Sequence, residues 1–569
     1  MKNILVAKIL NEIADILEMK DVEFKPRAYR KAARTVESLS RPIEEILEKG
    51  ELQNLSGVGK SIALKISEII ETGTSQYYEQ LKSEIPVDIE ELNSIEGMGP
   101  KTIELLYKTL GITTLQDLEN AARQNHIRDI KGLGPKTEEN ILAHIELAKR
   151  KKERMLLGHS LPIAEELKNK LENELSVITK IEVAGSLRRM KPTIGDIDIL
   201  VISTNHGQVA DYFTSMNDVK EVLGKGRTKI SVILKNGLHT DLRLIKESSY
   251  GSALLYFTGS KDHNIKLRLK ALEKGYKLSE YGLFKENKQI AGKTEKEVYS
   301  KLKMAFIPPE LRENRGEIEV ALENRIPEII KYDAIKGDLQ CHTKWSDGSN
   351  TIEEMAKSGL NQKYEYLCIT DHYGNMKIAG ALTDKQLQKE LKEIENINKS
   401  FDELEILKGA EIDILPDGSF NINQKLLKEL DVVIASVHSN FNQSKKEMTQ
   451  RVIKAMENEY VSIIAHPTGK KINMKQPIQM DMDVVFDASK ATGTFLEINS
   501  SPERLDLDDL NARAAVEAGC KLVIDTDAHT TDYMKFMRLG IAMARRGWLQ
   551  KKDVINTVGL KQLKKQLKH

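Results

Sequence analysis

The sequence has few cysteines, no long apolar run and almost no net charge. Its 569 residues contain three cysteines, Cys341, Cys368 and Cys520, and no Cys-x-x-Cys pair. This excludes a disulfide framework and indicates a reducing cytoplasm. No stretch approaches the ~20 apolar residues that a membrane-spanning helix needs. The first segment, MKNILVAKILNEIADILEMK, places acids within an apolar pattern and has no small-residue cleavage site, so it predicts an amphipathic helix and not a signal peptide.

The net charge of +1 conceals an uneven distribution along the chain. Residues 1–150 carry 21 Lys and Arg against 25 Asp and Glu, residues 151–315 carry 30 against 21, and residues 316–569 carry 35 against 39. A basic middle region indicates a polyanionic partner such as nucleic acid or nucleotide phosphates, although a solvated charged face is the alternative. The length predicts three or four domains, because one hydrophobic core rarely organises so long a chain.

Residues 1–150 have helical periodicity and repeat one short motif, which reads LSGVGKSIALKI (55–66), IEGMGPKTIELL (95–106) and IKGLGPKTEENI (130–141). In each copy a Gly-x-Gly turn precedes a helix-like run. Glycine permits a tight turn and lets backbone N–H groups at a helix N-terminus approach a phosphate. Three copies in one register favour helix-hairpin-helix modules, which bind the DNA backbone, over three ordinary turns. The predicted DNA contacts are Gly57, Gly59, Lys60, Gly97, Gly99, Gly132 and Gly134.

Three acids of the middle region lie in strand-like segments. Asp196 and Asp198 of GDIDILVI share one face of a strand, and Asp241 lies in HTDLRLI. Converging carboxylates suit a pair of Mg²⁺ ions, one activating an attacking hydroxyl and the other holding a triphosphate. The preceding GSLRR segment (185–189) offers backbone N–H groups, a hydroxyl and guanidinium groups to phosphate oxygens. A lone Asp-x-Asp is usually a pair of solvated acids. The segments GSLRR, GDID and TDLR, in this order along the chain, are a far more specific signal.

These motifs closely resemble the nucleotidyltransferase core of the family X DNA polymerases, the group that contains DNA polymerase beta. The resemblance rests on GSLRR, GDIDIL, TDLRL and YFTGS (256–260), and it covers roughly residues 1–315. It implies that Asp196, Asp198 and Asp241 bind metal, and that Asp241 is also placed to take the primer 3′-hydroxyl proton. It implies that the incoming nucleotide and the template minor groove are contacted by Gly185, Ser186, Arg189, Gly195, Tyr256, Phe257, Gly259, Asn264 and Arg268.

Two positions depart from the pattern of this family. Lys261 stands where its best-known member has an acid beside the nascent base, which leaves the detail of base-pair checking open. Lys65 aligns with the Schiff-base lysine with which some relatives remove a 5′-deoxyribose phosphate, but Ser61 replaces their second lysine. The alternative is that Lys65 is an exposed residue of the first hairpin module and that Lys60 contacts a backbone phosphate.

In residues 333–569, strand-like runs alternate with helical stretches, which predicts βα units and a parallel sheet or barrel. Five histidines and three acids stand at the ends of these runs: His342, His372, His438, His466, His529, Asp347, Glu411 and Asp527. Because the C-terminal ends of parallel strands meet at one rim, we expect a site for two or three ions of Mn²⁺, Fe or Zn²⁺. Each histidine alone would more often be a buried core residue.

This constellation resembles the polymerase-and-histidinol-phosphatase (PHP) domain, a distorted barrel of seven βα units that is fused to family X polymerases in many bacteria. The resemblance implies phosphoester hydrolysis, chiefly 3′-to-5′ trimming of DNA. The family's first motif is His-x-His, whereas here it reads Gln340-Cys341-His342. A neutral amide is a weaker ligand than imidazole, and Cys341 would point to the opposite side of the strand. We therefore expect a weakened metal position and reduced hydrolysis.

The sequence thus predicts a multidomain fold: a helical helix-hairpin-helix N-terminal region, an α+β nucleotidyltransferase palm and thumb, and a C-terminal α/β distorted (β/α)7 barrel. The predicted boundaries are 1–90 for a DNA-end-binding, lyase-like domain, 91–150 for a helix-hairpin-helix domain, 151–245 for the palm, 246–315 for the thumb, 316–332 for a linker and 333–569 for the PHP domain.

The predicted function is template-directed filling of short gaps in bacterial DNA repair, with 3′-end processing by the PHP domain. The expected cofactors are Mg²⁺ or Mn²⁺ in the polymerase site and Mn²⁺, Zn²⁺ or Fe in the PHP site. The expected partners are gapped or primed DNA and dNTPs, without a membrane, for a monomer in the cytoplasm at the nucleoid. The alternatives are a PHP phosphatase with a vestigial transferase and a non-catalytic DNA-end scaffold; the intact set of three palm acids counts against both.

Overall fold

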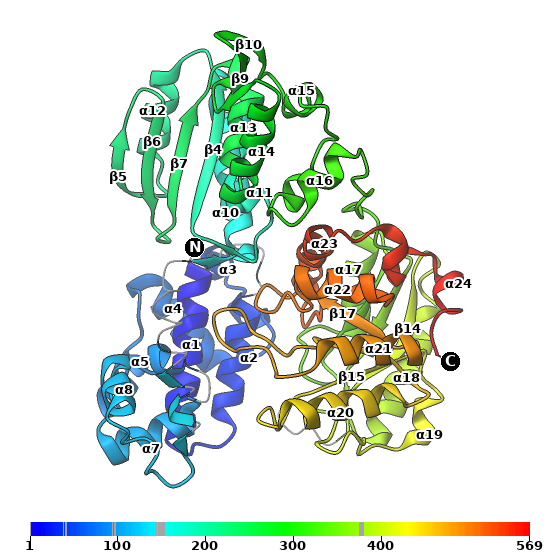
Figure 1. Ribbon diagram of the computed structural model, residues 1–569. Coiled ribbons are helices and arrows are strands. Elements are labelled where there is room, and N and C mark those ends of the chain that lie inside the picture. The colour runs from blue at the N-terminus through cyan, green and yellow to red at the C-terminus, as the bar shows by residue number, and fades with distance from the viewer. Residues whose placement is uncertain are drawn as a thin grey trace.

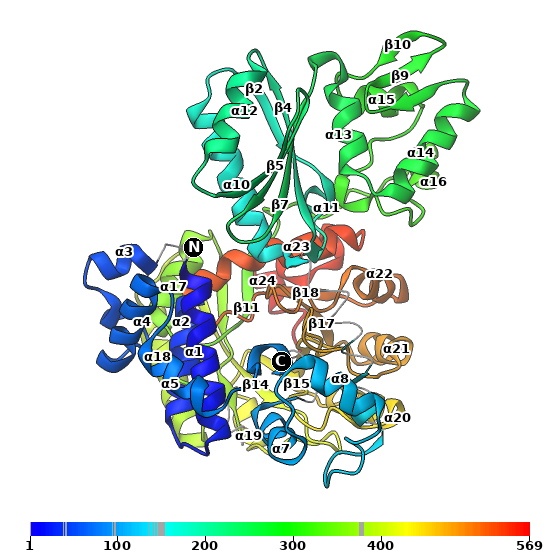
Figure 2. The ribbon, with the colours of Figure 1, turned by 90° about the vertical axis from the view of Figure 1, so that its left-hand side faces the viewer.

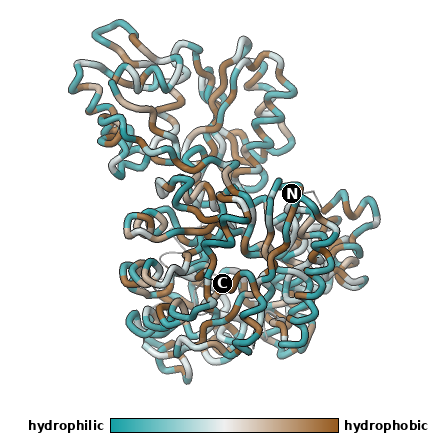
Figure 3. Tube along the Cα trace, turned by 90° about the vertical axis from the view of Figure 1, so that its right-hand side faces the viewer, coloured by the Kyte–Doolittle hydropathy of each residue, from teal (hydrophilic) through white to brown (hydrophobic). Residues whose placement is uncertain are grey.

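The computed structural model describes residues 2–37, 39, 43–93, 95, 98–135, 137–139, 141, 142, 145, 154–374 and 380–568. Figure 1 shows the N-terminal helices at the lower left, a lobe with an open sheet above them, and a barrel at the lower right. Apolar segments gather inside the lobes, and polar segments predominate on the outer loops (Figure 3). In the described part of the chain, no helix is both long and apolar enough to cross a membrane.

The N-terminal lobe is helical, as its periodicity predicts. Its helices are α1 (Lys2–Met19), α2 (Lys25–Glu37), α3 (Ile43–Glu48), α4 (Lys60–Thr72), α5 (Gln76–Glu84), α6 (Ile89–Asn93), α7 (Pro100–Leu110) and α8 (Leu115–Arg123). Their buried side chains form a single hydrophobic cluster that extends from Val6 to Ile145. The predicted boundary between residues 90 and 91 therefore crosses a continuous core.

The first and third copies of the repeated motif form equivalent turns, in which Gly57 and Gly132 have positive φ angles. In the first copy, Gly57 has a φ angle of 75°, which residues other than glycine rarely adopt. The Val58 N–H then bonds to the Leu55 carbonyl at 3.0 Å, and bonds of the same spacing recur in the other two copies. The second glycine of the first two motifs is the N-cap of α4 and of α7. Among the predicted DNA contacts, Gly97 lies outside the described residues.

The palm is built on one open sheet. Its elements are β1 (Met155–Leu156), α10 (Leu157–Glu174), β2 (Ile178–Val183), α11 (Gly185–Arg188), β3 (Thr193–Ile194), β4 (Asp196–Ser203), α12 (His206–Ser215), β5 (Val219–Lys225), β6 (Lys229–Leu234) and β7 (His239–Leu244). The strand order is β2-β4-β7-β6-β5, in which β4 and β7 are parallel. Helices α10 and α12 cover one face of this sheet, and α13 (Tyr250–Thr258) covers the other (Figure 2). Strand β2 ends at Val183, and the GSLR residues that follow form the short helix α11.

The thumb continues from α13 through α14 (Lys261–Glu273), β8 (Lys277–Ser279), β9 (Gly282–Lys285), β10 (Lys288–Ala291), α15 (Glu295–Lys301) and α16 (Glu317–Leu322). Helix α16 lies within the segment that the sequence predicts as a linker. Its Ile318 and Ala321 belong to the thumb's hydrophobic cluster. The buried Glu317 carboxylate lies 2.7 Å from His263 Nδ1. These contacts attach α16 to the thumb.

The C-terminal lobe is a nearly closed parallel barrel. Its strands are β11 (Gly337–Cys341), β12 (Tyr366–Ile369), β13 (His372–Tyr373), β14 (Glu405–Asp413), β15 (Val432–Ser436), β16 (Val461–Ile464), β17 (Phe495–Asn499) and β18 (Leu522–Asp525). They run in the order β11-β12-β14-β15-β16-β17-β18, and β13 pairs with β14. Around them lie α17 (Ile352–Asn361), α18 (Asp384–Asn398), α19 (Gln424–Leu427), α20 (Lys445–Met456), α21 (Met482–Thr492), α22 (Asp509–Ala518), α23 (Met537–Arg546) and α24 (Leu560–Leu563).

The two ends of the barrel sheet are joined by hydrogen bonds. The His342 N–H bonds to the Ala528 carbonyl at 2.8 Å. The Asn556 side chain donates to the carbonyls of Gly337 and Ile524, at 2.9 and 2.6 Å, and so fills the gap between β11 and β18. Because the ring is nearly closed and its strands are parallel, their C-terminal ends share one rim.

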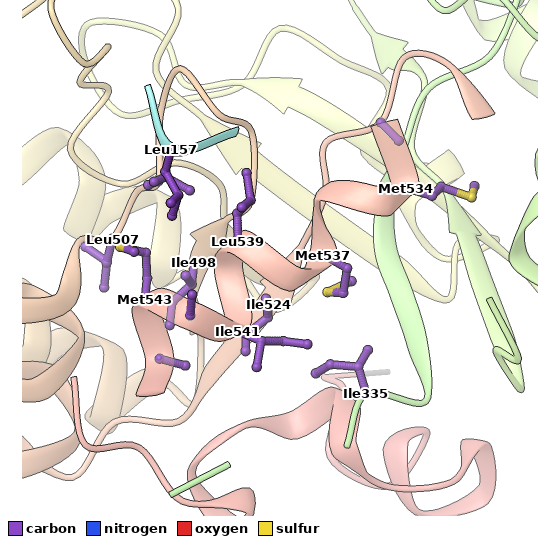
Figure 4. Close-up of a cluster of buried hydrophobic side chains, with 14 of the residues drawn as sticks. Leu157, Ile335, Ile498, Leu507, Ile524, Met534, Met537, Leu539, Ile541 and Met543 are labelled. Atoms are coloured by element: carbon purple, nitrogen blue, oxygen red, sulfur yellow. The ribbon is translucent and has the colours of Figure 1, made fainter. Parts of the chain in front are cut away.

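Both other lobes pack against the barrel. Leu157 of α10 belongs to one buried cluster with Leu507 and Leu539 of the barrel lobe (Figure 4). A Cβ atom at Gly158 would lie 2.7 Å from Pro502, so glycine permits this close approach. From the N-terminal lobe, helix α2 also reaches the barrel, which brings a helix-hairpin-helix element close to the barrel rim.

Candidate active sites

The first candidate site lies on the neighbouring strands β4 and β7 of the palm. The register pairs Asp198 with Asp241, and Asp196 precedes Asp198 on the same face of the strand. Lys229 Nζ lies 2.7 Å from Asp241 Oδ2, and the Ser231 hydroxyl donates to Asp241 Oδ1 at 2.6 Å. Burial raises the pKa of Asp241, but these two contacts outweigh it and lower the pKa overall. Asp241 is therefore held as a carboxylate.

Asp198 has a different environment. Burial and the neighbouring Asp196 raise its pKa to about 6, against the Arg243 guanidinium at 4.0 Å. The three acids share one end of the sheet, but they are not among the groups of described residues whose ligand atoms all lie within 4.8 Å of one another. Lys229 lies beside Asp241, and Arg243 lies beside Asp198. The all-oxygen donor set fits Mg²⁺ or Mn²⁺.

The GSLRR segment lies beside the palm acids. A Cβ at Gly185 would lie 2.7 Å from Asp198 Oδ2, so the backbone approaches the carboxylate closely. Ser186 Oγ is buried and has no hydrogen-bond partner among the described residues, which fits a hydroxyl that binds a ligand. Arg189, in contrast, is engaged: its Nε donates to Glu313 at 3.0 Å, and its Nη1 donates to the Thr258 carbonyl. Arg189 thus joins the palm to the thumb.

The remaining nucleotide contacts that the sequence predicts follow α13 and the start of α14. Tyr256, Asn264 and Arg268 line one small pocket. The Asn264 amide donates to the Tyr256 carbonyl at 2.7 Å. Phe257 lies under the Arg243 guanidinium at 4.1 Å, which connects this segment to the palm acids. Gly259 has a φ angle of 71° and faces Arg189, whereas Gly195 faces Arg154.

The second candidate site is on the barrel rim, where all eight predicted ligands converge. Ligand atoms lie within 4.8 Å of one another in three sets: His342, Asp347, His372 and His529; Glu411, His438 and His466; and His342, Glu411 and Asp527. His342 and Glu411 each belong to two sets. Shared ligands and this spacing fit a centre of two or three metal ions.

Glu411 is the central ligand of this arrangement. Its Oε1 lies 3.4 Å from Nε2 of both His438 and His466, and its Oε2 lies 3.3 Å from Nε2 of His342. Burial opposes ionisation of Glu411, but the surrounding imidazoles hold its pKa well below the usual range. Burial lowers the pKa of His438 to about 3, which keeps this imidazole in the neutral form that binds a metal.

Several buried polar atoms of the rim site have no hydrogen-bond partner among the described residues. They include Gln340 Oε1, His372 Nδ1, His466 Nδ1 and Glu411 Oε1. Buried polar atoms are almost always hydrogen-bonded, so this group of unpartnered atoms fits side chains that bind metal ions. Gln340 is fully buried, and its Nε2 donates to Glu411 Oε2 at 3.2 Å. Cys341 belongs to the hydrophobic core.

Comparison with known proteins gives matching families over much of the chain. Residues 1–75 match the helix-hairpin-helix domain, 89–146 the SAM-like helix-hairpin-helix tandem, 253–313 the DNA polymerase beta thumb and 338–501 the PHP domain. Over 99% of both chains, the protein is 39% identical to the DNA polymerase/3′-5′ exonuclease PolX of Bacillus subtilis (strain 168). The chain belongs to the family X DNA polymerases with a PHP domain.

Other relatives of this family X protein match parts of it. A probable phosphatase of Thermoanaerobacter sp. (strain X514) is 31% identical over 39% of this chain and 89% of its own length. DNA polymerase lambda of Arabidopsis thaliana is 26% identical over 54% of this chain and 61% of its own length. Because the phosphatase match is partial and the match to PolX covers the whole chain, a phosphatase with a vestigial transferase is not supported.

Three residues at the PHP site of this family X protein are not predicted by the sequence. Asp413 accepts a hydrogen bond from the His438 N–H at 3.1 Å, and strand alternation two residues after Glu411 could have indicated it. Arg504 Nε lies 3.9 Å from Asp527 Oδ2, and the Arg34 guanidinium lies 3.6 Å from Asp347 Oδ2. Arg34 comes from another domain, and no local pattern indicates its position.

Lys65, the predicted Schiff-base lysine, lies on α4. Its Nζ donates to Ser61 Oγ at 3.1 Å and lies 4.6 Å from the centre of the Tyr77 ring. Burial lowers the pKa of Lys65, which favours the neutral amine that a Schiff base requires. The lyase role remains a prediction.

Proposed function

We propose that this family X protein is a template-directed DNA polymerase with 3′-to-5′ exonuclease activity, which fills short gaps during DNA repair. The observation that carries the proposal is the presence of two clusters of candidate metal ligands in separate domains of one chain. The palm holds all three acids on paired strands, and the barrel rim brings eight metal-binding side chains together. The name of the full-length Bacillus subtilis relative supports both activities.

In the polymerase reaction, Asp196, Asp198 and Asp241 would hold Mg²⁺ or Mn²⁺, which supplies charge stabilisation to the triphosphate and lowers the pKa of the primer hydroxyl. Asp241 would accept the 3′-hydroxyl proton. Ser186 presents an unpartnered hydroxyl to a phosphate. Arg189 would bind the triphosphate by exchanging its contact with Glu313, so nucleotide binding and the palm–thumb contact are linked.

In the hydrolytic reaction, the eight rim ligands would hold Mn²⁺, Zn²⁺ or Fe, which activates water and stabilises the departing 3′ oxygen. The buried Glu411 connects the sets of ligands. The helix-hairpin-helix turns would hold the DNA backbone. We further propose a monomer that works at the nucleoid in the bacterial cytoplasm, where its three free cysteines stay reduced.

Gapped DNA is the substrate that tests this function. We expect faster extension on a one-nucleotide gap with a 5′-phosphate than on a simple primed template, because helix-hairpin-helix turns can hold the DNA on both sides of the gap. The measurement is primer extension with Mg²⁺ or Mn²⁺, together with degradation of the same primer without dNTPs. Equal rates on gapped and primed DNA would count against gap filling, and no extension with either metal would refute the polymerase assignment.

Gln340→His is expected to raise the rate of hydrolysis at limiting Mn²⁺. The imidazole would replace an amide whose Nε2 now bonds to Glu411, and it would complete the family's His-x-His pair. Changes of ligands and their partners alter affinity or activity by about 10- to 100-fold, and we expect a gain of that order. Metal content by elemental analysis and primer degradation across a Mn²⁺ titration check this. The control is Gln362→His, on the exposed surface of the same lobe. Full metal occupancy in the wild type, unchanged in the variant, would show that Gln340 is an adequate ligand.

A further inference from the structure

A basic residue of the helix-hairpin-helix region lies at the mouth of the PHP site. Arg34 is in the last turn of α2, and its Nη1 is 3.6 Å from Asp347 Oδ2. The other oxygen of this carboxylate, Oδ1, lies 3.3 Å from His529 Nε2. The Asp347 carboxylate therefore stands between the guanidinium and the three histidines of the first set of candidate ligands.

A second contact holds the same helix against the site. The buried Thr35 Oγ1 lies 3.4 Å from Ser349 Oγ, and the Ser349 N–H donates to the His529 carbonyl at 2.8 Å. Helix α2 is thus attached to the segment that carries two of the metal ligands. The position of Arg34 therefore depends on how the N-terminal lobe packs against the barrel, and not only on the conformation of its own exposed side chain.

The Arg34 guanidinium is also able to bind a further group. Its 3.6 Å separation from Asp347 exceeds hydrogen-bond length, and 55% of the side chain is exposed. Arg504 Nε lies 3.9 Å from Asp527 Oδ2, and Lys471 Nζ lies 3.7 Å from Glu503 Oε2, one residue before Arg504. Burial lowers the pKa of Lys471; Glu503 opposes this, and Arg504 and Arg34 add to it. Three cations beside an acidic metal centre suit a polyanion that extends past the metals.

We propose that Arg34 is a substrate-binding residue of the PHP site, and that it holds the DNA phosphate next to the scissile one. The proposal rests on the hydrolytic function proposed above. A substrate with one phosphate needs only the metal centre, whereas a DNA strand places its next phosphate at Arg34. The helix-hairpin-helix region would thereby make the hydrolytic site selective for polynucleotides.

The test uses the full-length protein with Mn²⁺ and two substrates: a single-stranded oligonucleotide and thymidine 5′-monophosphate p-nitrophenyl ester, which has one phosphodiester. Arg34→Ala should raise KM for the oligonucleotide by about 10- to 100-fold. It should also reduce the slope of log KM against log salt concentration by about one, which corresponds to one fewer phosphate contact. Hydrolysis of the ester should stay within about twofold. Arg34→Lys should restore part of the loss. Arg27→Ala, an exposed arginine about 10 Å earlier on the same helix, is the matched control.

Several results would overturn the proposal. Equal losses on both substrates would show that Arg34 only positions Asp347, and faster trimming by Arg34→Ala would make the contact inhibitory. An equal loss of polymerisation on primed DNA would make Arg34 a general DNA contact. If the wild type cleaves the ester but Arg34→Ala trims DNA normally, this inference alone fails. If the metal-loaded wild type cleaves neither substrate, the hydrolytic function fails as well.

Discussion

Asp198→Ala is expected to reduce nucleotide addition by at least about 10³-fold. The substitution removes a metal ligand, and the charge stabilisation that a metal ion gives the transition state is worth several kcal/mol, of which ~1.4 kcal/mol corresponds to each factor of ten. Primer extension with Mg²⁺ measures the loss. The 3′ trimming rate should stay within about twofold, because the ligands of the second centre lie in the PHP barrel.

The matched control for this experiment is Asp211→Ala. Asp211 is an exposed acid of α12 in the same domain, and its contact with Lys225 is at the surface. Loss of such an exposed ion pair lowers the free energy of unfolding by about 1 kcal/mol or less, so extension by this variant should be close to that of the wild type. Retained extension by both Asp198→Ala and Asp196→Ala would remove the two-metal assignment in the palm. A parallel loss of trimming would show that the two centres are coupled.

Where local periodicity determines the geometry, the sequence was sufficient to predict which candidate ligands lie together. Asp196 and Asp198 are two residues apart on a strand, so alternation alone puts them on one face. The histidines converge because each follows a parallel strand of a ring whose ends all meet at one rim. The repeated Gly-x-Gly turns likewise follow from the φ angles that glycine permits. In each case the pattern is contained within a few consecutive residues.

Contacts between distant segments could not be predicted in this way. Helix α16 looks like a charged bridge in the sequence, but Glu317 is buried because it meets His263 from another helix. Arg189 carries the family's signature for a phosphate ligand, yet in the folded chain it pairs with Glu313 and its carbonyl accepts a hydrogen bond from Arg546 of the barrel lobe. These positions depend on how whole domains pack, which no local pattern encodes.

The docking of α2 is the most consequential of these contacts between distant segments. Arg34 and Thr35 belong to a helix whose sequence indicates only an amphipathic face, and both reach the barrel rim. The catalytic domains of this chain are therefore not independent units joined by a linker. The DNA-binding region that serves the palm is also placed to serve the PHP site.

Glu411→Gln is expected to abolish hydrolysis, with a loss of at least about 10³-fold in 3′ trimming. Glu411 is in two of the three ligand sets, so the neutral amide would weaken more than one metal position while it preserves the size of the side chain. Loss of the negative charge also leaves the surrounding imidazoles without the carboxylate that pairs with them. Elemental analysis should show a reduced metal content, and gap filling should remain within about twofold.

Glu405→Gln provides the control for this substitution on the same strand. Glu405 begins β14, about 20 Å before Glu411, and forms a surface contact with Lys564 at the opposite end of the barrel. This variant should retain its metal content and its trimming activity, since the change in charge and shape is the same but the position is remote from the rim. Normal trimming by Glu411→Gln would show that Glu411 is not an essential ligand of the proposed metal site. A loss of trimming with full metal content would instead assign Glu411 a role in the reaction other than metal binding.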